Sequence, residues 1–245
     1  MSASTSPFAD EQLVPDPRDP AAPKPAGPTR AAESAALRAW KNVAGYAAAA
    51  CLAMAAAATV LRLWHADLRV PLFEMGDALT VEMTIHSIQE TGWFLDNSRL
   101  GAPGAQDLRE YPSADVLHYA TLKLLLIAFH DPGVVFNVFI LLPFPLTAVS
   151  AYFVFRRLRL GRLTALVPSV LYACTLYHFL RIGGHAFLAA YYLLPPMLWV
   201  ALRASLGRSP LLQAESPGGR PRWRLLSGQA AGAAALCILT GLAGL

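Results

Sequence analysis

Long apolar stretches constrain the fold of this chain more than any other feature of its sequence. They run over residues 43–63, 134–155, 163–180, 186–202 and 228–245. A helix rises about 1.5 Å per residue, so roughly 20 apolar residues cross the hydrocarbon core of a bilayer. Charged residues make up only 15% of the chain, whereas a typical soluble domain has about 25%. The pattern predicts an all-α polytopic membrane protein with about five transmembrane helices.

The segment before the first apolar stretch has a different composition. Its first 36 residues hold seven prolines and almost no large apolar side chains. Such a segment cannot bury enough surface to offset its conformational entropy, so residues 1–41 are expected to form a disordered cytoplasmic tail. Residues 42–63 then form the first transmembrane helix. A cleaved signal peptide is an alternative, although the leading segment is longer and more acidic than a usual basic n-region.

Residues 64–132, here called the acidic loop, separate the first apolar stretch from the other four. Ten of the sixteen acidic residues of the chain fall in this segment. They are Asp67, Glu74, Asp77, Glu82, Glu90, Asp96, Asp107, Glu110, Asp115 and Asp131. Only four Lys and Arg residues oppose them. The acidic loop is therefore predicted to lie outside the lipid, and residues 133–245 are predicted to hold the four further transmembrane helices.

The positions of the basic residues predict the orientation of the chain. The net charge is +4, but the Arg residues form short runs between apolar stretches, so they indicate topology rather than nucleic-acid binding. Basic runs occur at residues 156–162 and 203–226. Placing both in the cytoplasm with the N-terminus puts the acidic loop and the turn at residues 183–185 on the outer side. The chain ends within an apolar stretch, so we expect further sequence downstream.

Two helices are predicted within the acidic loop. Residues 116–129 are too short for an ordinary span and carry His118 and Lys123, so we expect an interfacial or re-entrant helix that begins after an N-cap at Ser113. A second helix is predicted over residues 78–91, with Asp77 as N-cap and Gly92 just past its end. Its apolar positions recur at helical spacing, and such a helix can lie flat on a membrane surface. These positions are Ala78, Val81, Ile85 and Ile88.

Carboxylates of the acidic loop are the first candidates for chemistry. Asp77 follows Gly76 at the start of the predicted helix. A carboxylate at this position is suited to take a proton from an attacking hydroxyl, although a plain N-cap explains the same residue. Asp107, Glu110 and Asp115 form a second acidic group. They are candidates to orient an acceptor or to bind a divalent cation, and solvation of a surface loop is the structural alternative.

The predicted outer turn between two spans adds cationic candidates. His178, Arg181 and His185 lie at or near this turn. Arg and His are natural partners for a phosphate, because Arg offers a planar fork of donors. An Arg that snorkels at a helix end is the structural alternative. The three cysteines all lie in apolar stretches without a C-x-x-C spacing, so zinc and disulfide sites are not expected.

Short motifs in residues 64 to about 200 resemble a known family. Gly76-Asp77, the stretch from Gly101-Ala102-Pro103-Gly104 to Tyr111-Pro112 with Asp115 after it, and Gly184-His185 are similar to YfhO-like bacterial membrane proteins. The order of one span, a large outer loop and a series of spans resembles the GT-C fold of membrane glycosyltransferases. Many such enzymes have paired acids in the first outer loop, whereas Glu74 and Asp77 are separated here by two residues.

The resemblance implies an activity and its partners. It implies a hexosyl or pentosyl transferase of the bacterial inner membrane that moves a sugar from a polyprenyl-phosphate carrier to a glycan, lipid or protein acceptor on the outer face. Asp77 would act as base, Arg181 and His185 would stabilise the departing phosphate, and Glu74, Asp107, Glu110, Asp115 and His178 would bind substrate. A divalent cation is a possible cofactor, and no nucleic-acid partner is expected.

Two other classes of function stay open. A glycolipid or polysaccharide transporter or flippase often has broken helices near mid-membrane, and prolines occur within the apolar stretches of this chain. They are Pro143, Pro145, Pro168, Pro195 and Pro196. A non-catalytic membrane scaffold whose acidic loop binds a partner is the third possibility.

Overall fold

The computed structural model describes residues 30–109, 115–207, 212–213, 222–223 and 228–244. The chain divides into two units, residues 1–42 and 43–245. In the first unit, the described residues form the start of helix α1 (Arg30–Leu61). The prediction of a disordered tail falls mostly on residues 1–29, which lie outside the described residues.

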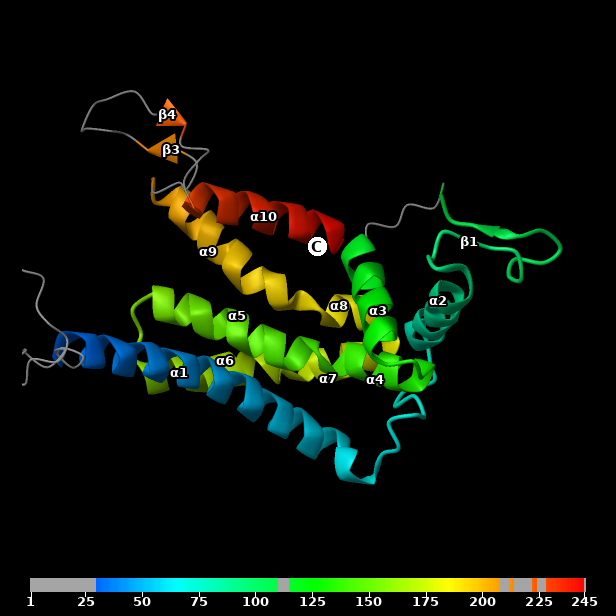
Figure 1. Cartoon of the computed structure of the whole chain (residues 1–245), viewed down its shortest axis with the longest axis horizontal. Coiled ribbons are helices and arrows are strands. Elements are labelled where there is room, and N and C mark those ends of the chain that lie inside the picture. Colours follow the sequence, from blue (N-terminus) through cyan, green and yellow to red (C-terminus); the bar gives the residue numbers. More distant parts are fainter. Residues whose placement is uncertain (1–29, 110–114, 208–211, 214–221, 224–227, 245) are drawn as a thin grey trace, which may run out of the picture. The chain divides into compact units, whose positions relative to one another are not determined.

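The second unit is mostly helical (Figure 1). Besides the rest of α1 it contains η1 (Leu63–His65), α2 (Asp77–Thr91), α3 (Val116–Ala128), α4 (Pro132–Leu141), α5 (Pro143–Arg157), α6 (Arg162–Ala173), α7 (Leu176–Gly184), α8 (Ala186–Ala189), η2 (Tyr191–Leu193), α9 (Leu194–Ser205) and α10 (Gly228–Leu242). Two short antiparallel pairs join β1 (Asp96–Asn97) to β2 (Gln106–Asp107) and β3 (Leu212–Gln213) to β4 (Arg222–Trp223).

Four helical segments are long and apolar enough to cross a membrane. They are Ala39–Leu61, Pro132–Arg157, Arg162–Gly184 and Ala186–Ser205. These segments match the first four predicted spans within a few residues. The fifth predicted span is not confirmed, because α10 has only 15 residues, about 22 Å at the usual helical rise. The part of the chain that the structure describes is thus mostly helical and contains four candidate membrane spans.

The exposed faces of these segments are apolar, as a lipid environment requires. On α6, Leu163, Val167 and Leu171 recur every four residues and are 60–79% exposed. Residues four apart lie on one face of a helix, so α6 presents a continuous apolar stripe away from the protein.

Two of the candidate spans are interrupted. The segment Arg162–Gly184 breaks at Cys174 and Thr175, and Thr175 has an extended backbone conformation. The segment Ala186–Ser205 changes from α8 to the 3₁₀ helix η2 at Ala190. Pro168 lies inside α6 without ending it, and Pro195 and Pro196 occupy the first turn of α9, where the missing backbone N–H is tolerated.

The Tyr191 hydroxyl holds the break between α6 and α7 in place. It donates to the carbonyl of Tyr172 over 3.0 Å and lies 3.3 Å from the Thr175 hydroxyl. The break leaves the last carbonyls of α6 without helical partners, and inside a bilayer such groups must be satisfied by the protein itself. Tyr191 therefore stabilises the end of α6.

Helix α2 packs by the stripe that its sequence predicts. Ala78, Val81, Ile85 and Ile88 are at most 4% exposed and belong to one core cluster with Phe136 of α4. The stripe is buried against α3 and α4, and the placement of α2 at a membrane surface stays a prediction. Gly92, in the left-handed conformation at φ 85°, ends the helix as predicted.

The N-caps of α2 and α3 are not the predicted residues. Gly76, not Asp77, is the N-cap of α2, and Asp77 is the first helical residue. Asp115 precedes α3, while Ser113 lies outside the described residues. α3 has only 13 residues, about 20 Å of length, so it is too short to span. It buries His118 and Leu122 and exposes Leu124 and Ile127.

Candidate functional site

The candidate site begins at the sharp turn that precedes α2. Gly76 has φ 58° and ψ −132°, a conformation that only glycine adopts without strain. A Cβ atom at this position would lie 3.3 Å from the backbone oxygen of Gly184. The absence of a side chain therefore lets the start of α2 approach the end of α7 closely.

This approach joins Asp77 to His185, which are 108 residues apart in the chain. Oδ2 of Asp77 lies 2.9 Å from Nδ1 of His185. Gly76 is the N-cap of α2 and Asp77 is its first helical residue, so the plain N-cap explanation does not describe Asp77. The two side chains are 55% and 48% exposed, and a molecule outside the protein can reach both.

His185 is held by its position between two helices. It ends α7 and begins α8, and its backbone N–H donates to the carbonyl of Arg181 over 2.8 Å. Among the described residues, Nε2 of His185 has no hydrogen-bond partner. A carboxylate on Nδ1 fixes the orientation of an imidazole and favours the tautomer whose Nε2 accepts a proton.

Two further predicted residues lie close to this pair in sequence. Arg181 is in the last turn of α7, with its guanidinium carbon 5.4 Å from the Tyr177 ring centre. It forms no ion pair with a carboxylate in the described part of the chain. Glu74 is exposed in the segment before Gly76. Both remain predictions as substrate-binding residues.

Asn137 of α4 was missed by the sequence analysis, yet it orders the segment that leads to Asp77. Its side-chain amide donates to the carbonyls of Leu68 and Val70 over 2.9 and 2.8 Å, and its oxygen accepts from the N–H of Leu72 over 2.9 Å. The residue is fully buried. A lone amide inside an apolar stretch is costly unless it is hydrogen-bonded, so this residue is the sequence signal for the contact.

Glu82 is a second residue that the sequence analysis did not place at the site. Oε1 of Glu82 is buried and lacks a hydrogen-bond partner among the described residues. Burial, and then the negative charge of Glu74, raise the pKa of this carboxyl, while His86 opposes the shift. A partly buried carboxyl whose pKa is raised by burial and by a neighbouring carboxylate is a feature of proton-transfer sites, so Glu82 joins the candidates.

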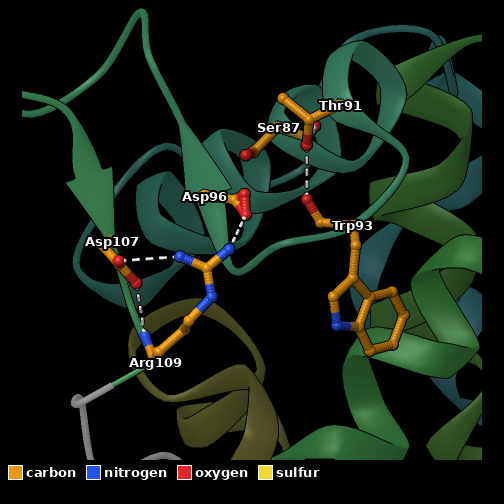
Figure 2. Close-up of polar contacts among 6 residues, drawn as sticks. All are labelled: Ser87, Thr91, Trp93, Asp96, Asp107 and Arg109. Atoms are coloured by element: carbon orange, nitrogen blue, oxygen red, sulfur yellow. Dashed lines mark hydrogen bonds and ion pairs between the residues drawn. The ribbon is translucent and has the colours of Figure 1, made fainter.

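Asp107 lies in the hairpin formed by β1 and β2, where Figure 2 shows it beside Arg109. Arg109 bridges it to Asp96, with N–O distances of 2.8 Å to Asp107 and 2.6 Å to Asp96. Hydrogen bonds from Arg109, first that of its backbone N–H, lower the pKa of Asp107. These contacts explain Asp107 as a residue that shapes the hairpin.

The other acidic predictions are placed only in part. Asp115 lies before α3, with Oδ1 3.6 Å from Nδ1 of the buried His118. Desolvation lowers the pKa of His118, and the Asp115 carboxylate opposes this shift. Glu110 lies outside the described residues. In the described ranges, no group of three or more His, Cys, Asp or Glu residues is arranged to hold a metal ion.

His178 is fully buried within the helical bundle. Its ring stacks on Phe144 with centroids 3.8 Å apart, and Nδ1–H donates to the carbonyl of Ala173 over 2.7 Å. The carbonyl of Ala173 is one of those freed by the break after α6. The structure thus gives His178 a role in packing that break and does not bring it to His185.

Comparison with known proteins adds no assignment. No family model, curated protein or solved structure matches this chain. The functional argument therefore depends on the geometry of the chain itself, and above all on the contact between Asp77 and His185.

Proposed function

We propose that this chain is a membrane glycosyltransferase of GT-C type, which transfers a sugar from a polyprenyl-phosphate carrier to an acceptor at the outer face of the bacterial inner membrane. The observation that carries the proposal is the exposed Asp77–His185 pair, 2.9 Å apart. The resemblance of Gly76-Asp77 and Gly184-His185 to YfhO-like proteins supports it, because these two motifs pack against each other.

The pair changes the roles that the sequence predicts. An acceptor hydroxyl attacks C1 of the sugar, the bond between C1 and the phosphate oxygen breaks, and polyprenyl phosphate departs. The hydroxyl proton passes to Nε2 of His185, and the Asp77 carboxylate stabilises the imidazolium that forms. Arg181, in the last turn of α7 before His185, would stabilise the departing phosphate, since phosphate is a preferred partner of the guanidinium fork.

The location of the pair supports an outer active site. In the proposed topology the N-terminal tail and both basic segments are cytoplasmic. The Asp77–His185 pair then lies at the outer end of the bundle, at the water boundary where a lipid-linked sugar presents its phosphate. The acceptor, whether glycan, lipid or protein, approaches from the aqueous side.

Release of polyprenyl phosphate from a labelled donor tests this proposal without knowledge of the acceptor. Membranes containing the chain are supplied with a polyprenyl-phosphate hexose and, separately, a polyprenyl-phosphate pentose. Because an oriented base contributes about 10²- to 10⁴-fold to such a step, Asp77→Asn and His185→Gln are each expected to slow release by at least about 100-fold. Glu82→Gln tests the alternative base in the same assay.

Asp67→Asn is the matched control for loss of charge. It removes one negative charge from the same loop, and Asn retains the oxygen that accepts from the backbone N–H of Arg69. Release at the wild-type rate is expected from this variant. Unchanged release from Asp77→Asn and His185→Gln, at normal membrane levels, would remove the pair from the mechanism and the proposal with it.

The interrupted spans favour one alternative, a glycolipid transporter. The breaks at Cys174–Thr175 and at Ala190 lie within two neighbouring candidate spans and are joined by Tyr191. Transporters commonly bind substrate at such breaks. In that case the chain moves glycolipid between leaflets of proteoliposomes without releasing polyprenyl phosphate, and Asp77→Asn leaves this movement unchanged.

A further inference from the structure

A groove lies between α5, α9 and α10, away from the Asp77–His185 pair. Its volume is about 350 Å³. Phe153, Trp199 and Leu236 contribute apolar walls, Gly232 leaves room on the α10 side, and Arg157 and Arg203 are its charged lining residues. The groove therefore combines an apolar channel with two cations.

The two arginines are held in place by aromatic rings of their own helices. The guanidinium carbon of Arg157 lies 4.9 Å from the ring centre of Phe153, and that of Arg203 lies 5.0 Å from the ring centre of Trp199. Such stacking fixes a guanidinium while leaving its N–H groups at the edge available to an acceptor. Neither arginine forms an ion pair with a carboxylate in the described ranges.

Both arginines occur where candidate spans end. Arg157 is the last residue of one candidate span, and Arg203 is two residues before the end of another, at Ser205. In a bilayer crossed by these spans, the two arginines lie at the depth of the lipid headgroups. Phe153 and Trp199, four residues earlier on the same helices, lie one turn deeper. Basic pockets between helices at this depth suit anionic headgroups.

We propose that this groove binds an anionic phospholipid, with the headgroup phosphate between Arg157 and Arg203 and an acyl chain along Phe153, Trp199 and Leu236. Charge complementarity selects an anionic over a zwitterionic lipid, and the apolar walls select a lipid over a free anion. The site does not depend on the proposed transfer reaction, because none of its residues belongs to the Asp77–His185 pair.

Trp199 supplies a probe within the groove. The full chain is reconstituted in vesicles that contain either brominated phosphatidylglycerol or brominated phosphatidylcholine, and the Trp199→Phe variant is subtracted to isolate the Trp199 signal. Brominated phosphatidylglycerol is expected to quench this signal at a lower mole fraction. Since each basic residue contributes about fivefold to binding of an anionic lipid, Arg157→Gln and Arg203→Gln should each raise the half-quenching mole fraction about fivefold.

Arg159→Gln is the matched control, because Arg159 is exposed in the same basic segment but does not line the groove. It should leave quenching unchanged. Arg157→Lys is a second variant, in case Arg157→Gln does not fold. It keeps the charge and loses the planar fork, so it should raise the half-quenching mole fraction by less than about fivefold.

Several outcomes would overturn this inference. Equal quenching by the two lipids would exclude selection of an anionic headgroup, and an equal shift in Arg159→Gln would indicate nonspecific surface charge. Relief of quenching by inorganic phosphate would identify a free-anion site. Weak quenching that varies with protein concentration would indicate that a second copy of the chain covers Trp199.

Discussion

Gly76 determines whether Asp77 and His185 can meet. Its positive φ and its closeness to the Gly184 backbone are independent reasons for the absence of a side chain. We expect Gly76→Ala to lower the free energy of unfolding by about 1–3 kcal/mol, the usual cost of a strained backbone. Thermal unfolding in detergent measures the loss.

Gly184→Ala tests the same contact from its other side. A Cβ atom on Gly184 would meet no atom within 4 Å, so this variant should be neutral or slightly stabilising. If the two alanine variants were equally destabilising, the contact between Gly76 and Gly184 would not be the reason for the effect.

The contact between Asp77 and His185 could not be predicted from the local sequence. Asp after Gly at the start of a helix predicts a cap, and local sequence alone favours that explanation for Asp77. The structure instead pairs Asp77 with His185, 108 residues away in the chain. No local sequence pattern predicts a contact over that separation. The same limit explains why Asp107, predicted beside the site, is bound by Arg109 in a hairpin.

At the scale of elements, helix positions followed from apolar length, but helix breaks did not. The segment Arg162–Gly184 reads as one apolar run, and its proline at 168 lies inside α6. The break occurs instead at Cys174, where Tyr191 and His178 from later elements satisfy the freed carbonyls of α6. Because Tyr191 belongs to a later element, its contact with the end of α6 could not be located from the local sequence.

Asn137 couples two elements, α4 and the segment that precedes α2. We expect Asn137→Leu to lower the free energy of unfolding by about 1.5–4.5 kcal/mol, because three hydrogen bonds to residues 68–72 are lost at roughly 0.5–1.5 kcal/mol each. Hydrogen exchange should also become faster at the Leu72 amide, whose acceptor is the Asn137 side chain. Thermal unfolding and exchange mass spectrometry measure the two effects.

Thr147 offers a control for this variant. It is equally buried in the next helix, and its hydroxyl has no hydrogen-bond partner among the described residues. Thr147→Val removes a buried polar group without removing a bond, so it should be neutral or stabilising. Faster exchange at the Leu72 amide in this control would show that any buried substitution loosens the segment. The effect of Asn137→Leu could then not be assigned to its hydrogen bonds.

At the scale of the second unit, helix α2, which carries Asp77, and the arginines Arg157 and Arg203 lie at opposite ends of the bundle. Figure 1 shows α2 and β1 at one end and the C-terminal ends of α5 and α9 at the other. The lining of the groove agrees, because Arg157, Arg203 and Gly228 meet there, whereas Phe144, near the start of α5, packs against α7. A membrane crossed by these helices therefore separates the two ends.

Cysteine labelling tests this separation and its direction together. After Cys51, Cys174 and Cys237 are replaced by alanine, a single cysteine is introduced as Ser98→Cys in the exposed hairpin segment or as Arg159→Cys in the basic segment. A membrane-impermeant maleimide added to intact cells should label the first and not the second, because basic segments stay in the cytoplasm. Labelling of both from outside would contradict the bipolar arrangement, since α5 and its neighbours would then not cross the bilayer between the two sites. Labelling of Arg159→Cys alone would preserve the separation but reverse the orientation, and would place the Asp77–His185 pair in the cytoplasm, against the proposed transfer at the outer face.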